Sequence, residues 1–184
     1  MRFYQRWKQI SRRIRVPLGF LFVIFYFWLA RPVPESLLAS LALVVPGILL
    51  RSYASGYVRK NAELATTGPY AYTRNPLYLG SILIAFGFAL AARNLWIVLA
   101  LALLFIVIYW PVILGEEEYL RAHFSGYGAY SERVPRLLPR LRIERAGAGG
   151  EFSLELYRQH REYNSLLGAF CIYLVLIART FLWR

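Results

Sequence analysis

The chain is poor in the residues that form disulfides and hold metals. Its 184 residues include a single cysteine, Cys171, and two histidines, His123 and His160. One cysteine forms no disulfide within a chain and builds no cysteine-based zinc site. Both histidines lie in charged segments, where a solvated side chain is expected. The sequence also lacks a glycine-lysine phosphate loop and a nucleophile-elbow serine. We therefore predict no metal site.

Acidic residues are also scarce. Ten Asp and Glu stand against 22 Lys and Arg, which gives a net charge of +12. In a soluble protein this excess would suggest a nucleic-acid partner. Here hydrophobic residues make up 58% and aromatic residues 17% of the chain, and the basic residues lie between apolar segments. This pattern predicts an integral membrane protein with no nucleic-acid partner, whose positive charge sets orientation and attracts anionic lipid.

Five apolar segments predict an all-α, polytopic helical bundle in a single domain over residues 1–184. A full span needs about 20 residues, so the two short segments are expected to tilt or to recruit flanking aromatic residues. Pro46-Gly47 is expected to kink the second segment, and Pro111 to disturb the end of the fourth. The short connectors at residues 31–34 and 93–94 predict helical hairpins. The segments cover residues 16–30, 35–56, 77–92, 95–114 and 165–183.

The distribution of basic residues predicts the orientation. Residues 1–15 carry six Lys and Arg, residues 51–76 carry four and residues 115–164 carry eight. The opposite side receives only Arg31, Arg93, Arg179 and Arg184. The positive-inside rule then places the N-terminus in the cytoplasm and the C-terminus on the opposite side. The polar segments 57–76 and 115–164 are expected to share the cytoplasmic face.

Residues 140–164 are expected to form a cytoplasmic connector that continues as an amphipathic helix from residue 152. An apolar set on this helix would rest on the membrane surface, with Arg158 and Arg161 facing lipid headgroups. The alternative is an ordinary lead-in to the last span. The apolar set is Phe152, Leu154, Leu156, Tyr157 and Tyr163.

Two motifs could carry chemistry. Residues 68–80 are polar, aromatic and rich in helix breakers, yet they run directly into an apolar helix. Irregular backbone beside lipid is tolerated where protein covers it or where it lines a cavity, so this segment predicts either a site at the membrane boundary or a rigid turn. Glu116, Glu117 and Glu118 directly follow an apolar run. They would form either a solvated helix end or carboxylates that bind a cation, such as Arg74 or a ligand amine.

The two motifs together resemble the isoprenylcysteine carboxyl methyltransferase family, which is related to the phospholipid N-methyltransferases. The resemblance covers residues 51–139, the expected core of the protein. Asn75 departs from the family pattern, which often has histidine there, and Ser125 replaces a glycine. The aromatic residues after Phe124 are also shifted by one position. The matching positions are Gly68, Pro69, Tyr70, Arg74, Pro76, Tyr78, Gly80, Glu116, Glu117, Leu120, Phe124, Val134, Pro135 and Pro139.

The resemblance implies S-adenosylmethionine as methyl donor, bound in a cytoplasmic pocket, and a lipophilic acceptor that enters from the bilayer. It implies catalytic roles for Arg74, Asn75, Glu117 and Arg136, the last of these orienting an anionic acceptor. It leaves open the acceptor, the choice among O-, N- and S-methylation, and the oligomeric state. The residues implied in cofactor binding are Gly68, Pro69, Tyr70, Arg74, Asn75, Pro76, Tyr78, Gly80, Glu116 and Glu117.

Two other functions fit the same frame. One is a non-catalytic membrane protein that binds lipid or acts as a scaffold, and the other is a sterol-reductase-like enzyme that uses NADPH. The methyltransferase interpretation makes a geometric prediction. Residues 74–78 and Glu116-Glu117 are expected to line one pocket on the cytoplasmic side, covered by Tyr127 or Tyr130. A lateral gap is expected to connect this pocket with the bilayer.

Overall fold

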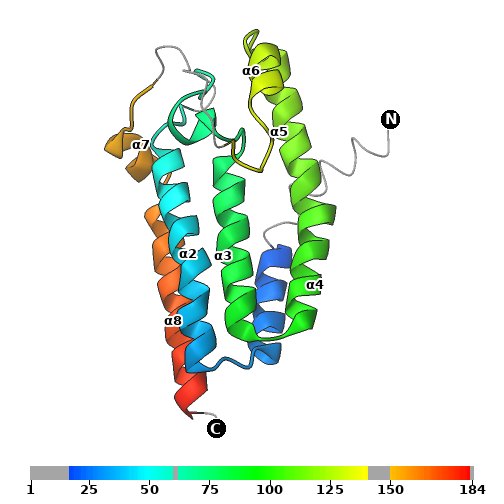
Figure 1. Cartoon of the computed structure of the whole chain (residues 1–184), viewed down its shortest axis with the longest axis vertical. Helices are drawn as coiled ribbons and strands as arrows, with labels where there is room; N and C mark the ends of the chain where they lie inside the picture. The colour runs from blue at the N-terminus through cyan, green and yellow to red at the C-terminus, as the bar shows by residue number, and fades with distance from the viewer. Residues whose placement is uncertain (1–16, 60–61, 141–149, 183–184) are drawn as a thin grey trace.

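The computed structural model describes residues 17–59, 62–140 and 150–182, which form a bundle of helices with irregular loops at one end (Figure 1). This part of the chain contains no strand, so the expected all-α class is confirmed. The first helix, Pro17–Leu29, carries no label in Figure 1. The labelled elements are α2 Pro34–Ser55, η1 Gly68–Ala71, α3 Pro76–Ala92, α4 Leu95–Leu104, η2 Phe105–Tyr109, α5 Trp110–His123, α6 Tyr127–Arg133, α7 Leu154–Gln159 and α8 Tyr163–Leu182.

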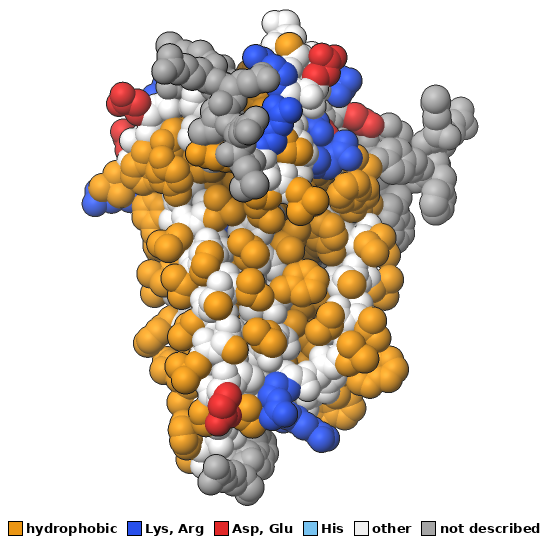
Figure 2. Space-filling view, in the orientation of Figure 1, with side chains coloured by type: hydrophobic (Ala, Val, Ile, Leu, Met, Phe, Trp, Pro, Cys, Tyr) orange, Lys and Arg blue, Asp and Glu red, His pale blue; other side chains and the backbone are white. Residues whose placement is uncertain are grey.

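Three helices are long and apolar enough to cross a membrane. They are α2, the continuous helix Leu95–His123 and α8, and the first helix and α3 are shorter apolar helices beside them. On the face shown in Figure 2, a broad belt of hydrophobic side chains lies between the two charged ends. Leucines on α2 illustrate this belt, because Leu38 is 70% and Leu49 is 63% exposed. The chain is therefore a membrane protein with a helical bundle, as its apolar segments predicted.

Local sequence signals explain where the helices begin and end. Pro34 and Pro76 open α2 and α3 at the first helical position, where the missing amide has no intrahelical partner to lose. Arg93 ends α3 in the left-handed region with φ 51°. Asn94 caps α4 by accepting a hydrogen bond from the Trp96 amide at 2.9 Å. The predicted tight hairpin between α3 and α4 is therefore present.

Glycines bring α2 and α3 into close contact. A Cβ on Gly80 would lie 2.7 Å from the carbonyl oxygen of Gly47, and one on Gly87 would lie 2.5 Å from a Val44 methyl group. Small residues let helix backbones approach in this way in membranes. Gly80 therefore packs against α2, and its expected contact with a cofactor stays a prediction. The α2 helix continues without interruption through Pro46.

The buried core lies towards the end of the bundle opposite the long loops. It includes Tyr26 of the first helix, Leu37 and Val44 of α2, and Leu176 of α8. The Tyr26 hydroxyl donates to the Phe88 carbonyl at 2.9 Å, and the Ser36 hydroxyl donates to the Ala91 carbonyl at 2.9 Å. These bonds satisfy polar groups within the apolar layer and tie the first helix and α2 to α3.

The helix that follows the α3–α4 hairpin is longer than predicted and contains a π-helical turn. Pro111 lacks an amide for the preceding turn, and the Trp110 amide donates to the Phe105 carbonyl, five residues earlier. The expected disturbance near Pro111 thus takes the form of η2, and the helix runs on to His123 instead of ending near residue 114. Glu116, Glu117 and Glu118 consequently lie inside a helix.

The segment after residue 150 is less helical than predicted. α7 covers only Leu154–Gln159, and Arg161, with φ 52°, separates it from α8. Phe152 stacks on Tyr53 with ring centroids 5.8 Å apart, so it packs on the end of α2 and not in an amphipathic helix. The Ser153 amide donates to the Gly56 carbonyl at 2.9 Å. Residues 141–149 of the expected connector lie outside the described residues.

Candidate active site

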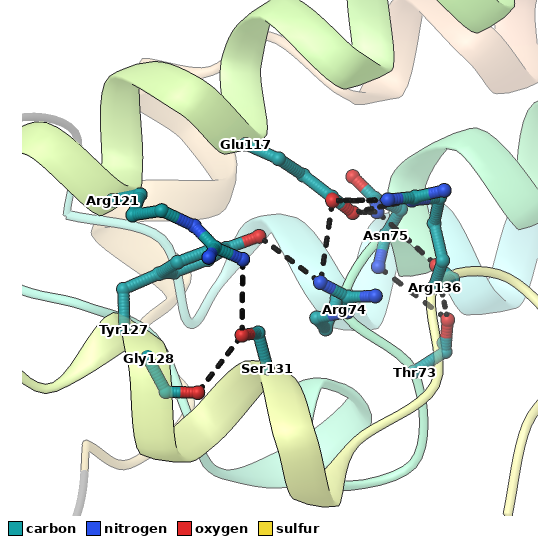
Figure 3. Close-up of polar contacts among 9 residues, drawn as sticks. All are labelled: Thr73, Arg74, Asn75, Glu117, Arg121, Tyr127, Gly128, Ser131 and Arg136. Atoms are coloured by element: carbon teal, nitrogen blue, oxygen red, sulfur yellow. Dashed lines mark hydrogen bonds and ion pairs between the residues drawn. The ribbon is translucent and has the colours of Figure 1, made fainter.

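Glu117 is the centre of a buried polar cluster at the loop end of the bundle. Its side chain is 9% exposed and contacts two arginines (Figure 3). Arg74 lies 3.2 Å from Oε2, and Arg136 lies 2.9 Å from Oε2 through Nη2 and 3.0 Å from Oε1 through Nε. A carboxylate this deep is stable because both oxygens accept charge-assisted hydrogen bonds. The cluster joins three segments that are distant in sequence.

Asn75 supports the same carboxylate. Its side-chain amide donates to Glu117 Oε1 at 3.1 Å and to the Arg136 carbonyl at 3.1 Å. The Thr73 hydroxyl also donates to the Arg136 carbonyl at 3.1 Å, and the Arg74 amide donates to the Pro135 carbonyl at 2.9 Å. The loop before α3 and the loop after α6 therefore run side by side. Asparagine does not ionise near neutral pH, so its contribution here is positional.

Aromatic side chains of α6 cover this cluster. Tyr127 accepts a hydrogen bond from Arg74 at 3.4 Å, and the Tyr130 hydroxyl donates to the Tyr70 carbonyl at 2.8 Å. Arg121 of α5 lies over the Tyr127 ring at 5.8 Å and donates to Ser131 at 3.4 Å, which fastens α6 to α5 (Figure 3). Burial raises the pKa of Tyr127 and that of Tyr130, so both phenols stay protonated at neutral pH.

A cavity of about 320 Å³ lies beside the cluster, and we call it the loop cavity. Its volume falls in the range of about 300–1,000 Å³ that is typical of small-molecule pockets. Charged, aromatic and aliphatic side chains from the loop after α2, from the start of α3 and from α5 share its wall. These residues are Val58, Arg59, Glu63, Leu64, Ala65, Tyr70, Arg74, Asn75, Pro76, Leu77, Tyr78, Glu116, Tyr119, Leu120, Phe124 and Tyr130.

Polar groups in the wall of the loop cavity are suited to a ligand. The Tyr78 hydroxyl donates to Glu116 Oε1 at 2.9 Å. Within the described residues, no cation forms an ion pair with Glu116. Arg74 Nε is buried and has no hydrogen-bond partner among the described residues. A buried donor without a partner is costly, so the geometry favours a ligand acceptor at this position.

A second cavity, the helix cavity, lies deeper in the bundle. It has a volume of about 140 Å³ and is bounded by the first helix, α3, α4 and η2. Tyr78 lines both cavities, so they meet at this residue. The π-helical turn η2 contributes three lining residues, and such turns often occur at functional sites. The lining residues are Gly19, Phe22, Tyr78, Ser81, Ile82, Ala85, Phe86, Leu101, Leu104, Phe105, Ile108 and Tyr109.

The structure brings together most of the residues predicted from the two motifs. Tyr70, Arg74, Asn75, Pro76, Tyr78 and Glu116 line the loop cavity. Glu117 and Arg136 lie behind this wall and hold Arg74 and Asn75. Gly68 adopts φ +57°, and a Cβ there would meet the Tyr57 ring at 2.5 Å, so it shapes the η1 turn together with the buried Pro69.

Some lining residues had no signal in the sequence. Val58, Leu64 and Ala65 belong to a loop without a recognisable motif, and Tyr119 lies one turn along α5 from Glu116. Helical spacing would have indicated Tyr119 if the helix had been expected to continue beyond residue 114. Arg136 was expected to bind an anionic acceptor. In the structure its guanidinium forms an ion pair with Glu117 and lies over the Trp110 ring, 5.2 Å from the ring centroid.

The chain is similar to known proteins over part of its length. The family model described as phospholipid methyltransferase matches residues 14–126. The cobalt-zinc-cadmium resistance protein CzcN of Cupriavidus metallidurans is 38% identical over 93 residues, which is 50% of this chain and 42% of that protein. The nickel-cobalt-cadmium resistance protein NccN of Alcaligenes xylosoxydans xylosoxydans is 36% identical over 94 residues, 51% of this chain and 43% of that protein. The match thus spans less than half the length of these relatives. No solved structure matches the chain.

Proposed function

We propose that this chain, which belongs to the phospholipid methyltransferase family and has helices long enough to span a membrane, transfers a methyl group from S-adenosylmethionine to a lipophilic acceptor. The observation that carries this proposal is the pair of cavities that meet at Tyr78. One lies among charged and aromatic side chains at the loop end, and the other lies among apolar helices. A polar cofactor and a lipid substrate need this combination.

The residues present fit this cofactor. S-Adenosylmethionine supplies a methyl group on a positively charged sulfonium and also carries an amino-acid end. Glu116 offers a carboxylate for a positive group, and Arg74 Nε offers a buried donor for an anionic or hydroxyl oxygen. Tyr70, Tyr119 and Tyr130 offer aromatic faces for a ring or for a cation. These contacts would hold the cofactor in the loop cavity.

The chemistry requires alignment more than proton transfer. Methyl transfer is a direct displacement, and fixing the two reactants in line supplies a large part of the rate. Glu117, Arg136 and Asn75 would act as positioning residues, because they hold the backbone and the guanidinium that form the cavity wall. Asn75 needs no proton for this task. Tyr127 and Tyr130 of α6 would exclude water from the site.

The acceptor would enter laterally through the helix cavity. Its tail would lie against apolar residues such as Phe22, Ala85 and Leu101, and its reacting group would reach Tyr78. A lipid tail crosses a charged loop at high cost, so entry between helices is favoured. The orientation with this end in the cytoplasm rests on the positive-inside rule. Among the described residues, no group of His, Cys, Asp or Glu could hold a metal ion.

The proposed activity is tested by methyl transfer to the lipids that copurify with the protein. Tritiated S-adenosylmethionine is added to purified protein with these lipid fractions, and the organic phase is counted. We expect radioactivity in one lipid class, which mass spectrometry identifies. Labelled lipid would favour the methyltransferase over a scaffold. Binding of reduced nicotinamide cofactor in place of S-adenosylmethionine, with no label transferred, would favour the reductase alternative and contradict the proposal.

A further inference from the structure

Three arginines gather at the end of the bundle opposite the candidate active site. Arg31 precedes α2, Arg93 ends α3 and Arg179 lies in the last turn of α8, and all three line one cavity of about 750 Å³, which we call the arginine cavity. The Arg31 amide donates to the Ala92 carbonyl at 2.9 Å, which holds the two loops together. Basic side chains are visible at the lower end of the bundle (Figure 2).

Arg31 and Arg93 have no acidic partner among the described residues. Glu35, at the start of α2, forms no ion pair with Arg31 or Arg93. Arg31 and Arg93 are exposed. Arg179 donates to the carbonyls of Phe27 and Trp28, so it is fixed at the end of the first helix. Like charges held around one cavity repel each other, and an anion between them would relieve this repulsion.

An apolar groove continues from the arginine cavity along the bundle. It is bounded by the first helix and α4 and has a volume of about 440 Å³. Trp28 lines both the groove and the arginine cavity, so the two are adjacent at this residue. Trp28 is 76% and Trp96 is 68% exposed, and tryptophans in such positions mark the level of the lipid headgroups. Leu99 and Leu103 extend the groove towards the bilayer interior.

We propose that the arginine cavity and this groove bind one anionic phospholipid. The phosphate would lie between Arg31 and Arg93, with Arg179 completing the positive wall, and an acyl chain would lie along Trp96, Leu99 and Leu103. The occupant is a lipid and not free phosphate, because an apolar groove lies directly beside the charged cavity. The site is at the opposite end of the bundle from the loop cavity and does not depend on the methyltransferase proposal.

Lipid retention measured by native mass spectrometry tests the site. The protein is equilibrated in micelles that contain equal amounts of phosphatidylglycerol and phosphatidylcholine with identical acyl chains. We expect wild type to retain one phosphatidylglycerol selectively. The R31Q/R93Q variant should lower this retention by about 30-fold, and each single variant by about fivefold. Trp96→Ala should lower it without a change of charge, whereas Arg133→Gln, an exposed arginine of α6, should leave it unchanged.

Three outcomes would overturn the proposal. They are equal retention by wild type and R31Q/R93Q, an equal loss in Arg133→Gln, and displacement of phosphatidylglycerol by millimolar inorganic phosphate. The first would show that Arg31 and Arg93 do not bind the lipid. The second would show that the effect is general electrostatic attraction. The third would show that the acyl chain contributes nothing to binding. Thermal unfolding in phosphatidylcholine micelles verifies that each variant is folded. The single variants keep the test available if the double variant is unstable.

Discussion

Replacing Glu117 by glutamine should cause a large loss of stability together with a loss of cofactor binding. The substitution keeps the size of the side chain and removes the negative charge that Arg74 and Arg136 share. Two arginines, with side chains 11% and 33% exposed, would then face an amide. Removing one partner from a buried ion pair costs about 3–5 kcal/mol. Chemical unfolding in detergent, followed by the intrinsic fluorescence of the tryptophans, measures this loss.

The matched control is Glu132→Gln, which removes a carboxylate from the exposed face of α6. A change of less than about 0.5 kcal/mol is expected there. If Glu117→Gln unfolds at the same denaturant concentration as Glu132→Gln and wild type, the ion pairs contribute nothing to the fold. The assignment of Glu117 as the positioning centre of the site would then be wrong.

Filling the helix cavity should abolish methyl transfer while leaving the cofactor site intact. Ala85 lines this cavity on α3, and phenylalanine at this position would occupy the space offered to the acceptor. A misplacement of about 1 Å in the reacting geometry costs about 100-fold in rate. We therefore expect transfer of tritiated methyl groups to fall by about 100-fold or more in Ala85→Phe. Binding of S-adenosylhomocysteine should stay close to that of wild type.

Ala42→Phe serves as the control for this substitution. Ala42 lies on an exposed face of α2 and lines none of the cavities described above, so the added ring meets lipid. Full transfer activity in Ala85→Phe would show that the acceptor takes another route. An equal loss of cofactor binding and methyl transfer would indicate a distorted fold. It would contradict the assignment of the acceptor and the cofactor to separate cavities.

The sequence predicted the helices well because their signals are local. Runs of apolar residues set the spans, and Pro34, Pro76 and Asn94 mark where helices begin. The approach of Arg74 to Glu117 also followed from sequence order, since two antiparallel helices return the chain to the face where it started. The hairpin at Arg93 makes this return unavoidable.

The parts that could not be predicted depend on packing between distant segments. Glu116 and Glu117 are adjacent in sequence, yet Glu116 lines the loop cavity and Glu117 lies behind it. Successive residues of an α-helix are separated by about 100° around its axis, so the two side chains point in different directions. Predicting this difference requires the knowledge that the helix continues to His123. Gly80 matched a family motif but serves the contact with α2. No local signal distinguishes a glycine that meets a ligand from one that meets another helix.

The binding of S-adenosylhomocysteine, measured by calorimetry on the purified, folded protein, tests the central claim most directly. We predict a saturable heat with a dissociation constant between about 1 µM and 1 mM. The affinity should fall by about tenfold or more in Glu116→Gln, because a carboxylate in the wall of the loop cavity is lost. A folded protein that gives no heat, or a Glu116→Gln variant that binds as tightly as wild type, would contradict this assignment of the site.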